Sequence, residues 1–521
     1  MSKFISTIQE GYEFEGTAIE LGAAMMDGEI FADAKVKIPL KMMNRHGLIA
    51  GATGSGKTKT LQILAEQLSA NGVPSLLMDI KGDLSGIAKA GESNPKIMDR
   101  HAKIGLPWIS EGNTVEFLSL SNEKGARLRA TVTEFGPVLF SKILGLNDTQ
   151  SGVVAVVFKY CDDKKLPLLD LRDIQKVLQH ITDAGKDDFE AAYGKTSTAT
   201  IGTIIRKIVE LEQQGADLFF GERSFEVKDL CRIDENGKGV ISVVRLSDIQ
   251  DRPKLFSTFM LQLLAEIYSS FPERGDVEQP ELVIFIDEAH LVFSEASSTL
   301  LNQIETVIKL IRSKGIGVYF ITQMPSDIPA AVLGQLGLRI QHALRAVTAI
   351  DRKNIKLAAQ NFPLTDFYDV ENMLTQVGIG EAFVTALNEK GIPTPLAYTH
   401  LRAPQSRMNI LTDSELGEIV DASDLVTKYN EEIDRDSAYE ILTGKLNDAS
   451  GEESSEESAS EAPVVDEGPS MFDKAKDVLS DAMSSPVARQ IGRTVAQEVT
   501  RGILGVLGLG GGRGGSRKGW F

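Results

Sequence analysis

A glycine-rich loop between a strand-like run and a helical run is the feature that most constrains this chain. The loop has the sequence GATGSGKT over residues 51–58, with the apolar run 47–50 before it and the apolar-periodic run 61–68 after it. A chain of phosphates needs several backbone N–H donors pointing at one place, and glycines let the backbone approach without a Cβ in the way. The spacing therefore predicts a phosphate-binding loop that joins a strand to a helix.

The side chains at the end of this loop have expected tasks. Lys57 would bring a mobile positive charge to the β- and γ-phosphates, and the Thr58 hydroxyl would bind Mg²⁺. The helix that begins near Gly56 would add the positive end of its dipole. We expect the phosphate-binding set to comprise Gly51, Ala52, Thr53, Gly54, Ser55, Gly56, Lys57, Thr58 and Lys59.

A second motif places two carboxylates after an apolar strand. Residues 282–286 have the sequence LVIFI and are followed by Asp287 and Glu288. We expect this strand to lie next to the phosphate-loop strand in a parallel sheet, so that Asp287 joins the Mg²⁺ shell and Glu288 polarises the attacking water. The alternative is an acidic helix N-cap after a core strand. The second acid favours turnover over binding alone, because a protein that only binds and switches does not need it.

The tetrapeptide at residues 287–290, DEAH, invites comparison with the RNA helicases of that name. Those helicases also carry a serine-alanine-threonine motif and an arginine-rich final motif, and neither string occurs in this chain. We therefore exclude that class and expect His290 to be a packing or capping residue.

Polar residues follow two more of the expected strands. Gln323 comes shortly after the run 317–321, where it could sense the γ-phosphate or hold the water, or could simply be a turn residue at the strand end. Asp79, Lys81 and Asp83 lie at the end of the expected strand 75–80, near the same edge of the sheet. They could be groups that support the site or ordinary loop residues.

Three arginines are candidates for a catalytic role across a subunit boundary. Arg312 precedes the run 317–321, whereas Arg339 and Arg345 are expected to bracket a further strand. One of them could reach the γ-phosphate of a neighbouring subunit as an arginine finger. For each, a surface ion pair is the alternative.

Strand-like runs alternate with helical patterns along most of the chain, which predicts an α/β fold with a mostly parallel sheet. Within 123–235 the strands disappear and apolar residues recur at helical spacing, which predicts a helical insertion. Segments 381–387 and 393–401 flank a turn and predict a hairpin. The expected strands are 47–50, 75–80, 115–120, 240–244, 282–286 and 317–321.

The net charge of −18 is distributed unevenly. Residues 448–467 hold eight acids and no base, so we expect a disordered linker over 448–470. Residues 471–521 carry a net +4 and include an amphipathic helical pattern, which could dock on a protein or an anionic membrane, or fold back on its own body. The body, 1–447, keeps −14, which argues against a surface coated with DNA-binding charge but not against a small basic channel.

Two further features bear on the compartment. The N-terminal segment carries acids and lacks the apolar core of a secretory signal, and no apolar run is long enough to span a membrane, so we expect a cytoplasmic protein. Cys161 and Cys231 are far apart in the sequence and are expected to be packing thiols rather than a metal or redox pair.

Together these motifs resemble those of the bacterial HerA-like P-loop ATPases of the YjgR type, in the HerA/FtsK group. The resemblance covers residues 13–408. It implies a RecA-like core, ATP and Mg²⁺ as cofactors, and assembly of the chain with itself into a ring, expected to be a hexamer. The motifs are RHGLIAGATGSGKT (45–58), MDIKGDLSG (78–86), LGLNDTQSGV (144–153), VIFIDEAHLVF (283–293), IRSKGIGVYFITQMPSDIP (311–329) and VLGQLGLRIQHALRA (332–346).

The same resemblance assigns Lys57, Thr58, Asp287, Glu288 and Gln323 to the roles given above. It also implies that one arginine among Arg312, Arg339 and Arg345 acts in trans.

One departure from that family bears on partners. HerA proper carries a β-barrel before its phosphate loop that engages a nuclease, whereas the segment before Gly51 is too short for a full barrel. A nuclease partner is therefore in doubt.

We expect the chain to have six parts. The core is divided between 1–122, which includes the N-terminal segment, and 236–408, with the helical insertion 123–235 between them. A helical extension (409–447), the linker (448–470) and a terminal helix with its tail (471–521) follow.

Two functions are open at this point. One is a ring-forming ATPase of the translocase or helicase type that moves DNA. The other is an ATP-dependent regulatory or scaffold protein that acts on a protein or membrane partner through residues 471–505. The acidic body modestly favours the second, but a ring motor can be acidic outside and basic only in its pore.

Overall fold

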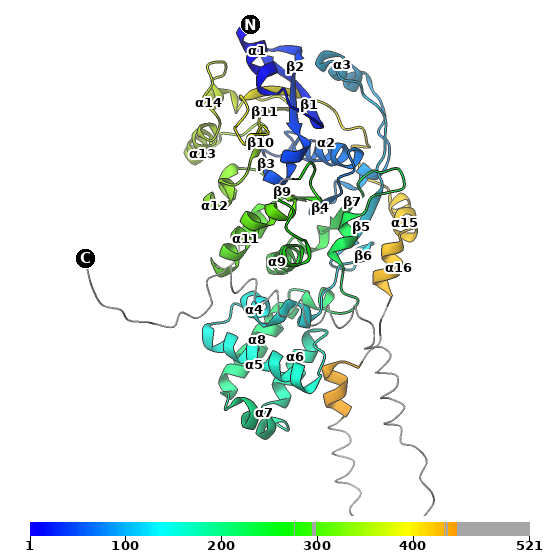
Figure 1. Cartoon of the computed structure of the whole chain (residues 1–521), viewed down its shortest axis with the longest axis vertical. Helices are drawn as coiled ribbons and strands as arrows, with labels where there is room; N and C mark the ends of the chain where they lie inside the picture. Colours follow the sequence, from blue (N-terminus) through cyan, green and yellow to red (C-terminus); the bar gives the residue numbers. More distant parts are fainter. Residues whose placement is uncertain (276, 294–297, 432, 434–435, 445–521) are drawn as a thin grey trace, which may run out of the picture. The chain divides into compact units, whose positions relative to one another are not determined.

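The computed structural model describes residues 1–275, 277–293, 298–431, 433 and 436–444 (Figure 1). The predicted linker and terminal helix, 448–470 and 471–521, lie outside the described residues. The chain divides into two compact units. Unit 1 comprises Met1–Arg129, Gln214–Phe219 and Arg223–Ile433, and unit 2 comprises Ala130–Gln213, Phe220–Glu222 and the described residues 436–444.

Unit 1 is built on one sheet with the strand order β2-β1-β12-β11-β10-β3-β9-β8-β4-β7-β5-β6. From β10 to β6 all neighbours are parallel, and from β2 to β10 all are antiparallel. The strands are β1 Ala18–Met26, β2 Glu29–Pro39, β3 Gly47–Ala50, β4 Ser75–Asp79, β5 Val115–Ser119, β6 Ala126–Arg127, β7 Ile241–Arg245, β8 Leu282–Ile286, β9 Ile316–Thr322, β10 Leu338–Gln341, β11 Glu381–Thr385 and β12 Ala397–Leu401.

Helices surround this sheet in unit 1 (Figure 1). Among them α2 contacts β3 and β4, whereas α9 packs against α10 and α11. The helices are α1 Ser2–Gly11, α2 Lys57–Ala70, α3 Pro95–Ile104, α9 Pro253–Ser270, α10 His290–Phe293, α11 Ser298–Ile311, α12 Ala330–Leu333, α13 Ala349–Gln360, α14 Val370–Met373, α15 Asp413–Asp421 and α16 Asp424–Asn430. The predicted α/β class and the six predicted strands are confirmed, with boundaries within a residue.

The predicted neighbour of the phosphate-loop strand is wrong. We expected β8, which carries the two carboxylates, to lie next to β3, but β9 lies between them and pairs in parallel with both. The central strand β9 is buried at all seven positions. Gly47 on β3 accommodates it, because a Cβ there would lie 2.4 Å from Cε1 of Tyr319.

The sheet continues into an antiparallel part that the sequence only partly indicated. The predicted hairpin is confirmed, since β11 pairs antiparallel with β12 from Glu381 and His400 to Val384 and Ala397. Beyond it, β1 pairs with β12 and β2 pairs with β1, so the N-terminal segment extends the same sheet. The sequence pattern does not predict these two strands.

His46 ties the start of β3 to its surroundings. It is 2% exposed and has a left-handed backbone, with φ of 57°. Its Nδ1 accepts from Val318 N at 3.0 Å, and its Nε2 lies 2.8 Å from Ile308 O. The neutral ring satisfies both contacts, with the proton on Nε2. Burial lowers the pKa of His46 to about 4.

Unit 2 is helical among its described residues. Its helices are α4 Val132–Ile143, α5 Asp148–Lys164, α6 Leu171–His180, α7 Lys186–Tyr193 and α8 Thr198–Glu212. Capping boxes at Asn147 and Asp170 start α5 and α6. Residues 438–444 form one more helix, whose Tyr439 N donates to Asp173 Oδ1 at 2.9 Å.

Both cysteines are free thiols, and burial raises the pKa of Cys161 and of Cys231 to about 12. Such thiols are poor nucleophiles and poor metal ligands, which agrees with the predicted packing role. None of the described helices has the length and apolar character needed to cross a membrane.

Candidate active site

The phosphate loop follows β3 and is fixed at its start by two neighbouring strands. Gly51 N donates to Thr322 O at the end of β9 (3.2 Å), and Ala52 N donates to Ala343 O just beyond β10 (2.7 Å). The loop is therefore hydrogen-bonded to the carboxyl ends of β9 and β10, the two parallel neighbours of β3. Ligands bind at this edge in open α/β sheets.

The middle of the loop offers hydrogen-bond donors. Gly54 and Gly56 have φ of 78° and 115°, in the left-handed region that favours glycine. In the described part of the chain, the backbone N–H groups of Thr53, Gly54, Gly56, Lys57 and Thr58 have no protein acceptor. A Cβ on Gly54 would meet nothing within 4 Å, so the loop is open there. These donors fit a phosphate chain.

Lys57 begins α2 and is 5% exposed. Its Nζ donates to Ala52 O at 3.2 Å, so the lysine is hydrogen-bonded to a backbone carbonyl of the phosphate loop itself. Burial, followed by the nearby charge of Lys81, lowers the pKa of Lys57. A bound polyphosphate would compensate the cost of burying this ammonium. Lys59 has another environment, because its Nζ donates to Met408 O at 2.6 Å.

A buried histidine that we did not identify from the sequence lies beneath the loop. His342 is fully buried, and its Nε2 lies 2.9 Å from Thr60 Oγ1 on α2. Burial lowers the pKa of His342 to about 4, so the ring is neutral near pH 7. Gly51 is required beside it, because a Cβ there would lie 2.5 Å from His342 Cβ.

The two carboxylates lie at the end of β8. Asp287 is 2% exposed, and burial raises its pKa to about 6. Its Oδ1 accepts from Glu288 N at 2.9 Å, whereas its buried Oδ2 has no hydrogen-bond partner among the described residues. Glu288 is 6% exposed and has φ of 45°, a left-handed conformation that is uncommon for a residue with a Cβ.

Lys81 and His290 surround Glu288. The Lys81 ammonium pairs with Glu288 Oε1, and His290 Nδ1 lies 3.2 Å from Glu288 Oε2. Burial alone would lower the pKa of Lys81, but the hydrogen bond to Glu288 and the charge of Asp287 together raise it. Residues 79–83 could be groups that support the site or ordinary loop residues. Lys81 lies in the site, whereas Asp79 stabilises its own loop by accepting from three of its N–H groups.

Gln323 and the arginines occupy different environments. Gln323 is exposed and follows β9, while Arg312 is exposed before it. Arg345 is exposed, and its guanidinium donates to Thr53 O of the phosphate loop at 3.3 Å. Arg339 does not flank the strand as we predicted but lies within β10, and its guanidinium donates to carbonyls of Asn361 and Leu333.

The protein oxygens at the site fit a magnesium ion whose other ligands are phosphate oxygens and waters. Among the residues that the structure describes, no group of three or more His, Cys, Asp and Glu side chains could hold a metal alone. Mg²⁺ in such sites takes one or two protein oxygens and keeps waters and phosphates. The unpartnered Asp287 Oδ2 and the half-buried Thr58 hydroxyl in the first turn of α2 meet that description.

Comparison with known proteins places the chain in a family. The family model described as "Helicase HerA-like C-terminal" matches residues 26–513. The DNA double-strand break repair helicase HerA of Sulfurisphaera tokodaii is 23% identical over 368 residues, which cover 68% of this chain and 65% of that protein. This chain thus spans less than two thirds of that relative.

Two further relatives are similarly distant. HerA of Sulfolobus acidocaldarius is 22% identical over 384 residues, covering 73% of this chain and 69% of that protein. The probable helicase MJECL08 of Methanocaldococcus jannaschii is 22% identical over 425 residues, covering 73% and 70%. Among solved structures, the bacterial conjugative coupling protein TrwBdeltaN70 in its unbound monoclinic form is similar in fold, with a TM-score of 0.50. The two sequences are 14% identical, and the match covers 78% of this chain and 94% of that chain.

Proposed function

Because the chain belongs to the HerA-like helicase C-terminal family, we propose that it is a Mg²⁺-dependent ATPase that assembles into a ring and moves along DNA. The observation that carries the ATPase proposal is the buried, unpartnered Asp287 Oδ2 with Glu288 directly after it. A buried carboxylate oxygen without a partner is costly unless a ligand completes it.

In this proposal each residue of the site has one task. The N–H groups of the phosphate loop and Lys57 bind the β- and γ-phosphates, and Thr58 and Asp287 hold the metal. Bound Mg²⁺ would neutralise charge that develops on the transferred phosphoryl group. Glu288 orients the attacking water and accepts its proton, and Gln323 contacts the water or the γ-phosphate.

Self-association is supported by an exposed apolar surface formed by Val347 and Ile350 at the start of α13. These two side chains are 84% and 71% exposed. Arg345, two residues before Val347, contacts the loop at Thr53. A neighbouring subunit that covered this surface would lie beside the nucleotide, from where one of its arginines could act in trans.

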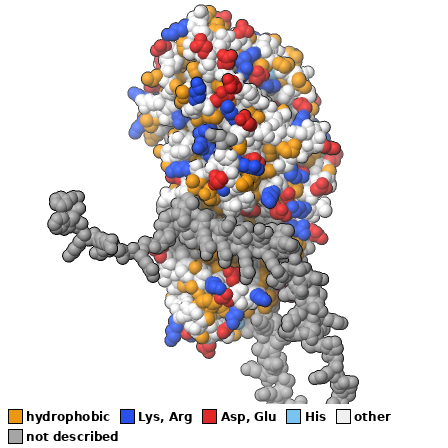
Figure 2. Space-filling view, viewed as in Figure 1, with side chains coloured by type: hydrophobic (Ala, Val, Ile, Leu, Met, Phe, Trp, Pro, Cys, Tyr) orange, Lys and Arg blue, Asp and Glu red, His pale blue; other side chains and the backbone are white. Residues whose placement is uncertain are grey.

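DNA as the polymer is supported by the relatives, two of which are DNA double-strand break repair helicases. Acidic and basic side chains intermix on the face drawn in Figure 2. A motor with such an outer surface would bind DNA inside its ring, where the charge can differ.

The test is ATP hydrolysis measured with and without DNA, at low salt, on protein whose solution mass is known. We expect oligomeric wild-type protein to hydrolyse ATP faster with DNA. Lys57→Ala should abolish turnover and weaken ATP binding, whereas Glu288→Gln should abolish turnover and keep binding. No stimulation of a competent oligomer by DNA would refute the motor and favour a regulatory ATPase, and full activity of Glu288→Gln would show that another group activates the water.

A further inference from the structure

One carboxylate oxygen of Glu288 is engaged by a side chain of its own chain. Oε1 is paired with the Lys81 ammonium, whereas the buried Oε2 has no hydrogen-bond partner among the described residues, although His290 Nδ1 lies 3.2 Å from it. The Glu288 side chain is 8% exposed, so water competes little for these oxygens. A glutamate side chain otherwise rotates about several torsions, and the ion pair with Lys81 restricts the orientation of its terminal group.

The sheet brings Lys81 to this position. Strands β4 and β8 are parallel neighbours, with Met78 opposite Ile286, so the residues after each strand meet at the same edge. The loop that carries Lys81 is itself fixed, because Asp79 Oδ1 accepts from Gly82 N at 2.8 Å and Oδ2 accepts from Leu84 N at 3.1 Å. Lys81 is therefore presented to Glu288 by a rigid turn.

We propose that Lys81 is a positioning residue for ATP hydrolysis, which orients the Glu288 carboxylate toward the attacking water and acts through Glu288 rather than on the nucleotide. This inference rests on the proposed ATPase function. The left-handed backbone of Glu288 supports it, because such a conformation persists only where surrounding contacts determine it. Pre-orientation of a general base raises kcat because misplacement in the transition state is costly.

The competing role is direct binding of phosphate by Lys81. Besides Glu288, the charges of Asp287 and Asp83 raise the pKa of Lys81, and the charge of Lys81 in turn lowers the pKa of Lys57. A phosphate ligand would contribute to nucleotide affinity, whereas a positioning residue contributes to kcat alone. Binding and turnover therefore separate the two roles.

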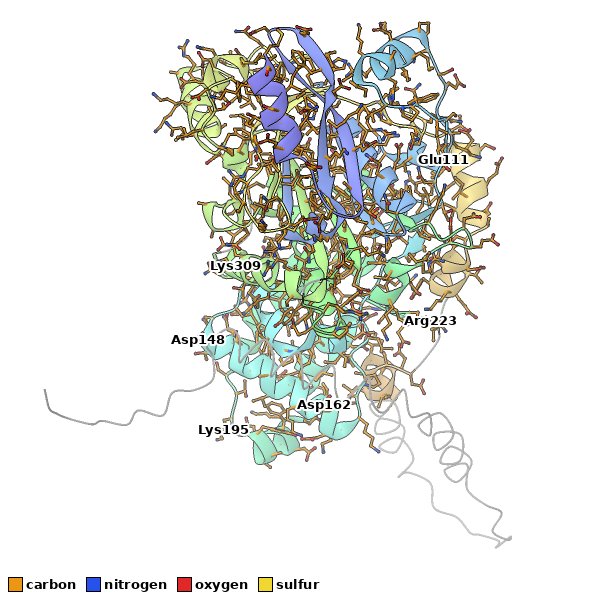
Figure 3. The ribbon with its side chains drawn as sticks, turned by 45° about the horizontal axis from the view of Figure 1, so that its top comes forward. Glu111, Asp148, Asp162, Lys195, Arg223 and Lys309 are labelled. Atoms are coloured by element: carbon orange, nitrogen blue, oxygen red, sulfur yellow. The ribbon has the colours of Figure 1, made fainter. Side chains whose placement is uncertain are left out.

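The first experiment compares Lys81→Met, which removes the charge but keeps most of the length, with Lys81→Arg, which keeps the charge. We expect Lys81→Met to lower kcat about ten- to a hundredfold and to leave the Kd for a non-hydrolysable ATP analogue within about twofold. Lys81→Arg should recover most of the lost kcat. Lys309→Met, at an exposed lysine on α11 (Figure 3), is the matched control and should behave as wild type.

The second experiment needs no turnover. Thermal unfolding without nucleotide is measured for Lys81→Met in the wild-type and Glu288→Gln backgrounds. In the wild type the substitution leaves a buried carboxylate without its cation, so the Tm should fall by more than it does in the Glu288→Gln background.

Any of four results would overturn the proposal. They are an unchanged kcat in Lys81→Met, a Kd for the analogue that rises in proportion to the lost kcat/KM, equal Tm losses in the two backgrounds, and failure of Lys81→Arg to recover activity. Absence of ATP turnover in the wild-type protein would instead refute the proposed function, and the Tm comparison would then show whether the pair exists without a catalytic role.

Discussion

The buried His46 gives a prediction whose size follows from its contacts. Its Nδ1 accepts from Val318 N, so a second proton on the ring would place two donors against each other. The pKa of His46 is about 4 in the folded chain against an ordinary 6.5. The unfolded chain therefore binds more protons between these values, and stability rises as pH rises through that window. Between about pH 5 and about pH 7.5 the gain is about 2 kcal/mol.

The perturbation is His46→Asn. Asparagine tolerates the left-handed backbone of this position but cannot take up a proton. At about pH 7.5 we expect the variant to be less stable by about 2 kcal/mol, because it cannot keep both hydrogen bonds to Val318 and Ile308. At about pH 5 the wild type has lost a similar amount, so the difference between the two proteins should nearly vanish.

The assay is urea unfolding followed by tryptophan fluorescence at several pH values. The chain has two tryptophans, and Trp520→Phe in both proteins leaves Trp108, which lies in unit 1 and whose indole N–H donates to Pro404 O at 2.8 Å. Subtracting the two proteins at each pH removes the other titrating groups. A stability difference that stays constant from about pH 5 to about pH 7.5 would refute the argument, because His46 would then titrate alike in the folded and unfolded chain.

Three further predictions concern the assembly of subunits, the binding of Mg²⁺ and the contact between Glu66 on α2 and the backbone of Gln405 and Ser406. The double variant Val347→Asp, Ile350→Asp should lower both the solution mass and the ATPase rate. The control Ile109→Asp, at a residue that is 57% exposed, should change neither. An unchanged solution mass in the double variant would exclude the surface at Val347 and Ile350 as the interface. Asp287→Asn should raise the Mg²⁺ concentration needed for half-maximal turnover about tenfold or more, and an unaltered Mg²⁺ titration would contradict its assignment. Glu66→Gln should destabilise the protein by about 2–4 kcal/mol in urea unfolding, because the buried carboxylate accepts from Gln405 N and Ser406 N at 2.9 Å each; a loss under about 0.5 kcal/mol would show that these bonds contribute little.

The parts of the site that are contiguous in sequence could be predicted well. The phosphate loop needs glycines, a lysine and a hydroxyl at fixed spacing between a strand and a helix, and the structure has β3 before it and α2 after it. The pair Asp287 and Glu288 likewise ends an apolar strand, β8, as predicted. In both cases the chemistry depends on neighbours along the chain, so local pattern is enough.

The partners of these residues could not be predicted in the same way. Lys81 and His342 follow two other strands, β4 and β10. Nothing in their local sequence distinguishes a lysine paired with Glu288, or a histidine beneath the phosphate loop, from ordinary loop residues. From the sequence, Lys81 could support the site or be an ordinary loop residue, and only the pairing of β4 with β8 decides between these alternatives.

The α/β class, the phosphate loop and the acidic strand end follow from the amino-acid sequence, because strand periodicity and loop chemistry are local properties. Tertiary structure alone decided that β9 separates β3 from β8, that β1 and β2 extend the sheet, and that Arg339 lies inside β10. Strand order depends on which buried faces and edges fit one another across long stretches of chain. Such contacts join residues far apart in sequence, and they leave no periodic pattern from which the order could be inferred.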